Sequence, residues 1–137
     1  METARISYVG QLRTNAVHLK SSTEIITDAP TDNHGKGEAF SPTDLLATAL
    51  GSCMLTIMGI KANEHGFQLL DATASITKEM AADPRRVAQV RIDITIPDLD
   101  YTAEQKFILH DAAINCPVAK SLSESLKQTV TFTFEKV

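Results

Sequence analysis

The sequence contains two cysteines, Cys53 and Cys116, and these are the residues best suited to covalent chemistry. A thiolate is a strong nucleophile, and two thiols together can cycle through a sulfenic acid and a disulfide. Structural disulfides are rare in reducing compartments, so two cysteines in a cytosolic chain indicate either inert buried thiols or a redox pair. A zinc site is disfavoured, because two thiols are too few ligands and the four histidines show no ligand spacing with them.

The two cysteines have different local settings. Cys53 lies within the apolar run 45–62, where desolvation disfavours a thiolate and favours a small, inert buried side chain. Cys116 precedes Pro117, and a proline at the first helical position places Cys116 at a helix N-cap. Backbone N–H groups and the positive end of the helix dipole favour a thiolate there. On local grounds Cys116 is the better nucleophile, and a reactive Cys53 needs a cation from elsewhere in the fold or from a partner subunit.

A long helix must position Cys53. Ser41 is suited to the N-cap, Pro42 to the first helical position and Asp44 to the first turn, while Gly66 can end the helix. The segment 45–62 is apolar on almost every face, which is typical of a buried helix or a membrane span, and its polar residues and flanking strands favour the buried helix. At about 1.5 Å per residue the helix is roughly 35 Å long, too long for a small monomer to cover. A partner subunit is therefore expected to bury part of it.

Strands with period-two alternation flank this helix. The first three predict an antiparallel meander, and a long polar loop follows over residues 28–40. The predicted strands cover residues 5–9, 12–19, 23–27, 67–78, 87–96 and 129–135. Two shorter helices are expected over residues 102–114, where Thr102 and Gln105 form a capping box, and 118–126. The order βββ-α-ββ-α-α-β predicts a single α+β domain over residues 1–137.

Composition excludes other classes of protein. The net charge is −4 and no Lys/Arg cluster occurs, which argues against nucleic-acid binding. The first residues form no apolar signal segment, and no uninterrupted apolar run reaches about 18 residues. The sequence predicts a cytoplasmic protein that binds neither nucleic acid nor membrane.

Two segments resemble signatures of the OsmC/Ohr superfamily. Residues 41–53 (SPTDLLATALGSC) are similar to its central-helix signature, and residues 115–122 (NCPVAKSL) to its second cysteine motif. The separation of the motifs, the chain length and the order of elements all agree, so the resemblance spans essentially the whole chain. It implies an intertwined α+β homodimer, with antiparallel sheets packed around a long buried central helix and two equivalent active sites at the dimer interface.

The resemblance also implies roles for individual residues and reverses the local ranking of the thiols. In the family the helix cysteine attacks the peroxide and the later one resolves the sulfenic acid, so Cys53 would be peroxidatic and Cys116 resolving. An arginine from the N-terminal strands supplies the cation. Arg13 stands at that place, with a solvated strand arginine as the alternative interpretation and Arg5 as the weaker candidate. His18, further along the same hairpin, is either a supporting residue or a surface residue of the strand.

The sequence departs from the family at the acid that holds this arginine. Family members usually place a glutamate ten residues before the helix cysteine, and Thr43 occupies that position here. Asp44 is nine residues from Cys53, on the opposite side of a straight helix, and is expected to act first as a cap and second as an arginine partner. Glu38 could substitute by folding back from the long loop. The departure bears on peroxidase activity and not on the fold.

The implied function is thiol-dependent reduction of organic hydroperoxides to alcohols through a two-cysteine sulfenic acid/disulfide cycle. No metal or organic cofactor is required, and an external dithiol, of lipoyl type in the family, resets the pair. The apolar surroundings of Cys53 favour organic hydroperoxides over hydrogen peroxide. The alternative is a non-catalytic OsmC-like dimer that binds a small apolar or thiol-reactive ligand, with the cysteines as pocket lining; Thr43 supports it.

Overall fold

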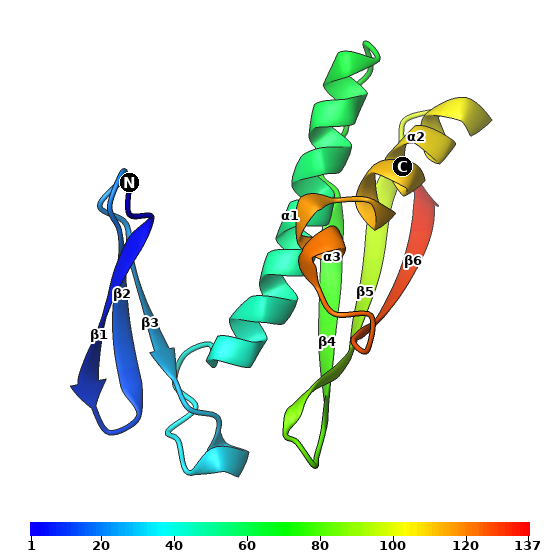
Figure 1. Cartoon of the computed structure of the whole chain (residues 1–137). Helices are drawn as coiled ribbons and strands as arrows, with labels where there is room; N and C mark the ends of the chain where they lie inside the picture. Colours follow the sequence, from blue (N-terminus) through cyan, green and yellow to red (C-terminus); the bar gives the residue numbers. More distant parts are fainter. The chain divides into compact units, whose positions relative to one another are not determined.

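The computed structural model describes every residue from Met1 to Val137. The residues form two compact units, Met1–Leu46 and Ala47–Val137. Each unit contains one three-stranded sheet, β1-β2-β3 in the first and β4-β5-β6 in the second. The helices and strands follow one another in the predicted order βββ-α-ββ-α-α-β (Figure 1), with one additional 3-10 turn in the long loop, η1 (Thr31–Asn33).

The first unit is the predicted antiparallel meander. Its strands are β1 (Ala4–Gly10), β2 (Arg13–His18) and β3 (Glu24–Asp28). The tight turn between β1 and β2 holds Gln11 and Leu12 at positive φ, 53° and 63°, which matches the twist of a two-residue hairpin. As a result, β2 begins at Arg13, directly after a sharply defined turn.

This sheet exposes most of its apolar side chains. Ile6 pairs with Ala16, which pairs in turn with Ile25, so these three residues share one face of the sheet. Ile6 and Ile25 are exposed. Within the strands of this unit only Thr27 and Asp28 are buried. The unit therefore has almost no apolar core of its own within a single chain.

The central helix α1 (Pro42–Glu64) begins as the sequence predicts. The Asp44 N–H donates to Ser41 Oγ at 3.0 Å, and the Ser41 N–H donates to Asp44 Oδ2 at 3.0 Å. This reciprocal arrangement satisfies two N–H groups at the start of the helix, with Pro42 at the first helical position. At the other end Gly66, at φ +75°, ends the helix, as expected.

Helix α1 is buried along one stripe only. The buried residues recur at three- and four-residue spacing and are Ala47, Leu50, Gly51, Met54, Met58 and Ala62. Leu46 and Ile60 are exposed. The helix is long and apolar enough to span a membrane, with a mean hydropathy of 1.6, but the core helix of a soluble protein has the same properties. A single chain thus leaves part of the helix exposed, in agreement with the expectation that a small monomer cannot cover it.

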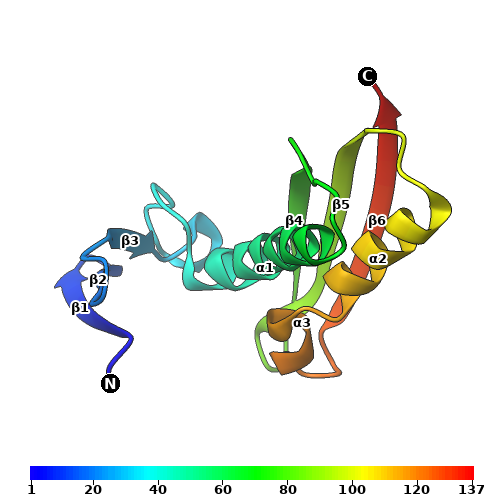
Figure 2. The ribbon, with the colours of Figure 1, turned by 90° about the horizontal axis from the view of Figure 1, so that it is seen from above.

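The second unit packs three helices on one face of a sheet. The strands are β4 (Thr73–Ala81), β5 (Arg86–Asp98) and β6 (Lys127–Lys136), and the shorter helices are α2 (Ala103–Ile114) and α3 (Pro117–Ser121). Seen from above in Figure 2, α1, α2 and α3 all lie on the same side of β4, β5 and β6. Alternate residues of β5 face these helices and are buried, namely Val90, Ile92, Ile94 and Ile96.

This sheet is mixed, which corrects the expectation of purely antiparallel sheets. Strand β4 pairs with β5 in antiparallel fashion, whereas β5 pairs with β6 in parallel, with Ile92 opposite Val130. The connection from β5 to β6 contains α2 and α3. A parallel pair needs a crossover of this length, whereas an antiparallel pair does not.

Two predicted boundaries were wrong. Strand β4 begins at Thr73 and not at Phe67, because the preceding segment packs on Tyr101: the Phe67 ring meets it edge-on at 5.9 Å, and the Gln68 carbonyl accepts from its hydroxyl at 2.7 Å. Helix α3 ends at Ser121 and not at residue 126. The Ser123 hydroxyl accepts from a nearby backbone N–H in a local turn, and such bonds compete with helix. The capping box at Thr102 is confirmed.

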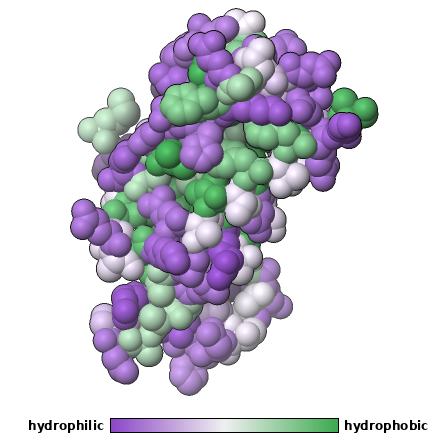
Figure 3. All heavy atoms as spheres, turned by 90° about the vertical axis from the view of Figure 1, so that its right-hand side faces the viewer, coloured by the Kyte–Doolittle hydropathy of each residue, from purple (hydrophilic) through white to green (hydrophobic).

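Apolar side chains also reach the surface of the second unit. Figure 3 looks from the side on which β6 and α2 lie in Figure 1 and shows apolar atoms gathered among polar ones. The large exposed apolar residues of this unit include Phe107, Ile60, Leu70 and Leu99. Single exposed apolar residues are normal, whereas the stripe of α1 belongs to the buried core.

We predict that Leu50→Ala lowers the free energy of unfolding by about 2–5 kcal/mol, because it removes a fully buried side chain from the middle of this stripe. Urea unfolding at fixed protein concentration measures the loss. Leu99→Ala removes the same atoms from an exposed position and is the matched control. Equal losses in the two variants would contradict the packing described for α1.

We further predict that Gly59→Ala raises the free energy of unfolding by up to about 1 kcal/mol. Gly59 lies inside α1, and a Cβ added there has no atom within 4 Å, so the gain in helix propensity meets no clash. Thermal unfolding provides the measurement. A clear loss of stability would mean that this side of the helix is covered in solution.

Candidate functional site

Cys53 and Cys116 meet within the second unit. Cys53 lies in the middle of α1, and Cys116 is the N-cap of α3, with Pro117 at the first helical position. Both are free cysteines, and the two side chains lie 3.7 Å apart. Two sulfurs joined in a disulfide are about 2.05 Å apart. The two thiols are therefore not bonded to each other in this structure, but they are close enough for a disulfide to form after a small approach.

The two thiols differ in their exposure to solvent. Cys116 is completely buried, whereas Cys53 is half-buried and packs at the edge of the core. Burial raises the pKa of the Cys116 thiol, and its hydrogen bond to Cys53 raises that pKa further. The amides of Ala119 and Val118 act in the opposite direction and do not offset the burial. This burial argues against the local prediction that Cys116 is the better nucleophile, because desolvation outweighs the helix N-terminus.

A shallow cavity of about 420 Å³ lies beside the helix that carries Cys53. Strand β4 forms its other wall, and its lining residues are Thr48, Gly51, Ser52, Leu55, Thr56, Ala74 and Ile76. Cys53 is not among the lining residues. The cavity is mostly apolar, so it can accommodate an alkyl group beside α1.

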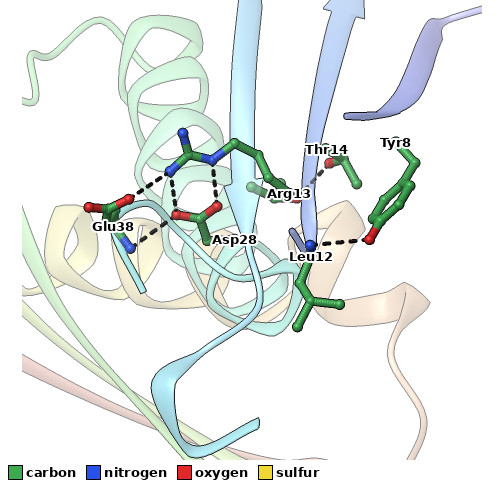
Figure 4. A network of polar contacts seen from close by, with 7 residues as sticks. Tyr8, Leu12, Arg13, Thr14, Asp28 and Glu38 are labelled. Carbon is green, nitrogen blue, oxygen red and sulfur yellow. Dashed lines mark hydrogen bonds and ion pairs between the residues drawn. The ribbon is translucent and has the colours of Figure 1, made fainter. Parts of the chain in front are cut away.

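The second group of candidate residues is centred on Arg13 in the first unit. Arg13 and Asp28 are direct cross-strand neighbours in β2 and β3, so their side chains lie on the same face of the sheet. Arg13 Nε donates to Asp28 Oδ1 at 2.7 Å, and Nη2 donates to Asp28 Oδ2 at 2.8 Å (Figure 4). Nη2 also donates to Glu38 Oε1 at 3.1 Å. The guanidinium is thus bound by two carboxylates.

Asp28 is the main partner of Arg13, and no sequence motif indicated it. Its side chain is 1% exposed, and it also accepts the N–H of Glu38 at 3.1 Å. The Arg13 guanidinium holds the pKa of the Asp28 carboxyl below its usual range, and Asp28 raises the pKa of Arg13. Antiparallel pairing around the turn after residue 19 brings position 28 near position 13, but only the observed register places the two residues opposite each other.

Glu38 and Asp44 were the acids considered as arginine partners. Glu38 does fold back from the long loop to Arg13, but its side chain is 64% exposed, so solvent weakens this ion pair. Asp44 forms the capping arrangement with Ser41, as expected. Thr43, at the position of the family glutamate, lies beside Ser41, and the two hydroxyls are 3.2 Å apart.

His18 and Arg5 are placed apart from this cluster. His18 is five residues from Arg13 in the same strand, and an odd spacing places the two side chains on opposite faces. The His18 ring bonds to the Ser21 hydroxyl in the next turn. Arg5 forms an ion pair with Glu2 at 2.7 Å, and both side chains are well exposed. Arg13 is therefore the arginine of these strands with a buried acid as its partner.

The family model described as OsmC-like protein matches residues 35–131. A search of the curated proteins finds no match. Among solved structures, a protein from Psychrobacter arcticus described as an osmotic stress induced and detoxification response protein is 54% identical, with 96% of each chain covered and a TM-score of 0.91.

Two more distant structures share the fold. An organic hydroperoxide resistance protein OsmC from Legionella pneumophila is 16% identical, with 97% of this chain and 98% of that chain covered and a TM-score of 0.76. An organic hydroperoxide resistance protein from Vibrio cholerae, with captopril bound in one of its active sites, is 17% identical, with 96% and 92% covered and a TM-score of 0.74. Because the family model matches most of the chain and both cysteine motifs fall within the matched residues, this protein belongs to the OsmC-like family.

Proposed function

We propose that this protein reduces organic hydroperoxides to alcohols with Cys53 and Cys116 as a redox pair. The observation that carries the proposal is the position of the two thiols, one half-buried and one fully buried, 3.7 Å apart. A reactive thiol must be reached by its substrate, whereas a resolving thiol needs only to reach the first. The arrangement supports Cys53 as peroxidatic and Cys116 as resolving.

The proposed cycle has three steps. The Cys53 thiolate attacks the distal oxygen of the hydroperoxide, the O–O bond breaks, and the leaving alkoxide takes a proton to become the alcohol. The Cys116 thiol then attacks the sulfur of the Cys53 sulfenic acid, giving a disulfide and water. An external dithiol restores both thiols by exchange and is itself oxidised to a disulfide. We propose a lipoyl-type dithiol as this reductant.

Arg13 is proposed as the cation that assists Cys53. Its guanidinium is a planar donor that can stabilise a thiolate and bond to a peroxide oxygen. The two acids on its Nε and Nη2 edge keep it charged and ordered. Asp44 is proposed as a cap and His18 as a surface residue, without a part in the reaction.

We also propose a cytoplasmic homodimer built from one functional domain per chain. The family match at residues 35–131 runs across both compact units, which supports treating residues 1–137 as one domain. The exposed apolar face of β1-β2-β3 and the uncovered side of α1 support a partner subunit. One helix, α1, is long and apolar enough to cross a membrane, and a single helix of this kind is weak evidence for a membrane span.

The second candidate function is a non-catalytic dimer that binds a small apolar or thiol-reactive ligand. Thr43 at the position of the family glutamate favours it, and the apolar cavity beside α1 offers a place for such a ligand. In this case the thiols would survive peroxide unchanged, and ligands would raise the thermal stability without turnover.

We predict that stoichiometric cumene hydroperoxide removes both free thiols from the reduced protein, and that a dithiol restores them. Cys53→Ser should keep its remaining thiol, because the peroxidatic sulfur is absent. Cys116→Ser should form a sulfenic acid on Cys53 that dimedone traps, because no resolving thiol is present. Thiol counts and intact mass provide the measurements.

These outcomes separate the two candidate functions. Two thiols that persist in peroxide would exclude the peroxidase and leave the binding protein. Loss of thiols in Cys53→Ser at the wild-type rate would instead assign the attack to Cys116.

We also predict that Cys116 makes the folded protein less stable in alkali. Below about pH 8.5, the usual thiol pKa, both the folded and the unfolded state carry the proton. Because burial raises the pKa of Cys116 in the folded state, the unfolded state loses its proton first as the pH rises, and stability falls. Urea unfolding from pH 7 to 10 should show a steeper fall for Cys53→Ser than for Cys53→Ser/Cys116→Ser. Parallel curves would contradict the buried, protonated thiol.

A further inference from the structure

The Arg13–Asp28 pair joins two strands of a sheet that has almost no fully buried side chains. Among the strand residues of the first unit only Thr27 and Asp28 are buried, and Asp28 carries a charge. Taking a carboxylate out of water is costly unless a partner compensates it. Arg13 compensates it with two parallel N–H···O bonds, which fix the plane of the guanidinium as well as its distance.

The backbone on both sides of this pair is also fixed. In the turn before Arg13, the Leu12 N–H donates to the Tyr8 hydroxyl at 3.2 Å, and the Leu12 carbonyl accepts from the Ala29 N–H at 3.0 Å. The Asp28 N–H donates to the Phe40 carbonyl at 3.1 Å. Leu12 has a positive φ, which is strained for a branched side chain and persists only where the surroundings hold it. Arg13 is thus held at both ends: the neighbouring backbone is fixed by hydrogen bonds, and the guanidinium is fixed by Asp28.

This anchoring leaves one nitrogen of Arg13 unused. Arginine carries five N–H donors, one on Nε and two on each Nη. Asp28 accepts the Nε proton and one of the Nη2 protons, and Glu38 accepts the other Nη2 proton. Nη1 makes no hydrogen bond within the chain, and in Figure 4 it is the guanidinium nitrogen without a dashed line.

We propose that Asp28 is the positioning residue for Arg13, and that it leaves the Nη1 edge free to donate to an oxygen of the hydroperoxide. Asp28 thereby takes the part that Thr43 cannot perform, since a threonine has no charge to orient a guanidinium. The inference rests on the proposed function. Glu38 adds a single exposed bond to the same edge and contributes less to the orientation.

The test compares Asp28→Asn with wild type in the rate at which cumene hydroperoxide consumes the Cys53 thiol. A misplaced donor costs on the order of 10- to 100-fold in rate, which is the loss expected for Asp28→Asn. Asp28→Glu keeps the charge and should recover part of that loss. Glu24→Gln is the matched control, because Glu24 is an exposed acid of the same strand that does not contact Arg13, and it should leave the rate unchanged.

A double-variant comparison shows whether Asp28 acts through Arg13. Arg13→Gln alone should lower the rate at least as much as Asp28→Asn. Adding Asp28→Asn to Arg13→Gln should then cause no further loss, because the residue to be positioned is gone. Urea unfolding of all variants, together with alkylation of Cys53 by iodoacetamide, shows whether the fold and the thiol remain intact.

Nuclear magnetic resonance of the Arg13 side chain gives a readout that does not depend on turnover. An Nε–H bonded to a buried carboxylate should exchange slowly with water in wild type and in Glu24→Gln. It should exchange rapidly in Asp28→Asn. Slow exchange in Asp28→Asn would show that Asp28 does not hold the guanidinium and would overturn the inference.

The remaining outcomes separate this inference from the proposed function. An active wild type with an equally active Asp28→Asn, or with additive losses in the double variant, would overturn the role of Asp28 and leave the peroxidase intact. A wild type that leaves the peroxide unreacted would overturn the proposed function and the inference with it. That result is visible in wild type alone.

Discussion

The apolar stripe of α1 packs on the sheet β4-β5-β6, and this contact sets the position of Cys53. The stripe runs through Leu50 and Met54, immediately beside the cysteine, so Cys53 lies at the edge of the buried surface. Gly51 brings the helix close to the sheet, since a Cβ there would stand 2.4 Å from Ile76 Cδ1. The rotation of the helix about its axis is thereby fixed, and with it the direction of the thiol.

The crossover from β5 to β6 brings the second thiol to the first. Because β6 runs parallel to β5, the chain must return along the helical face of the sheet, and Cys116 lies on that return at the start of α3. The position is fully buried, and this burial raises the pKa of the Cys116 thiol, whereas Cys53 is half-exposed. The packing that brings the two sulfurs together therefore also gives them different exposure to solvent.

The first unit is stabilised in a different way. It buries little apolar surface, and its order depends on hydrogen bonds and on one buried ion pair between β2 and β3. Such a unit can hold a charged side chain in one orientation while leaving it open to other molecules. In the proposed reaction the second unit therefore supplies the two thiols, and the first unit supplies a cation held in a fixed orientation.

The sequence by itself determined the order of elements, the caps of α1 and α2, and the two cysteine motifs, because caps, periodicity and motif residues are local properties of the chain. It also indicated Arg13 and Glu38. Only the tertiary structure decided the parallel pairing of β6, the burial of Cys116 and the partnership of Arg13 with Asp28. Strand direction depends on how helices cover a sheet, and thiol ionisation depends on burial by distant residues. The arginine's partner depends on strand register, which no local pattern specifies.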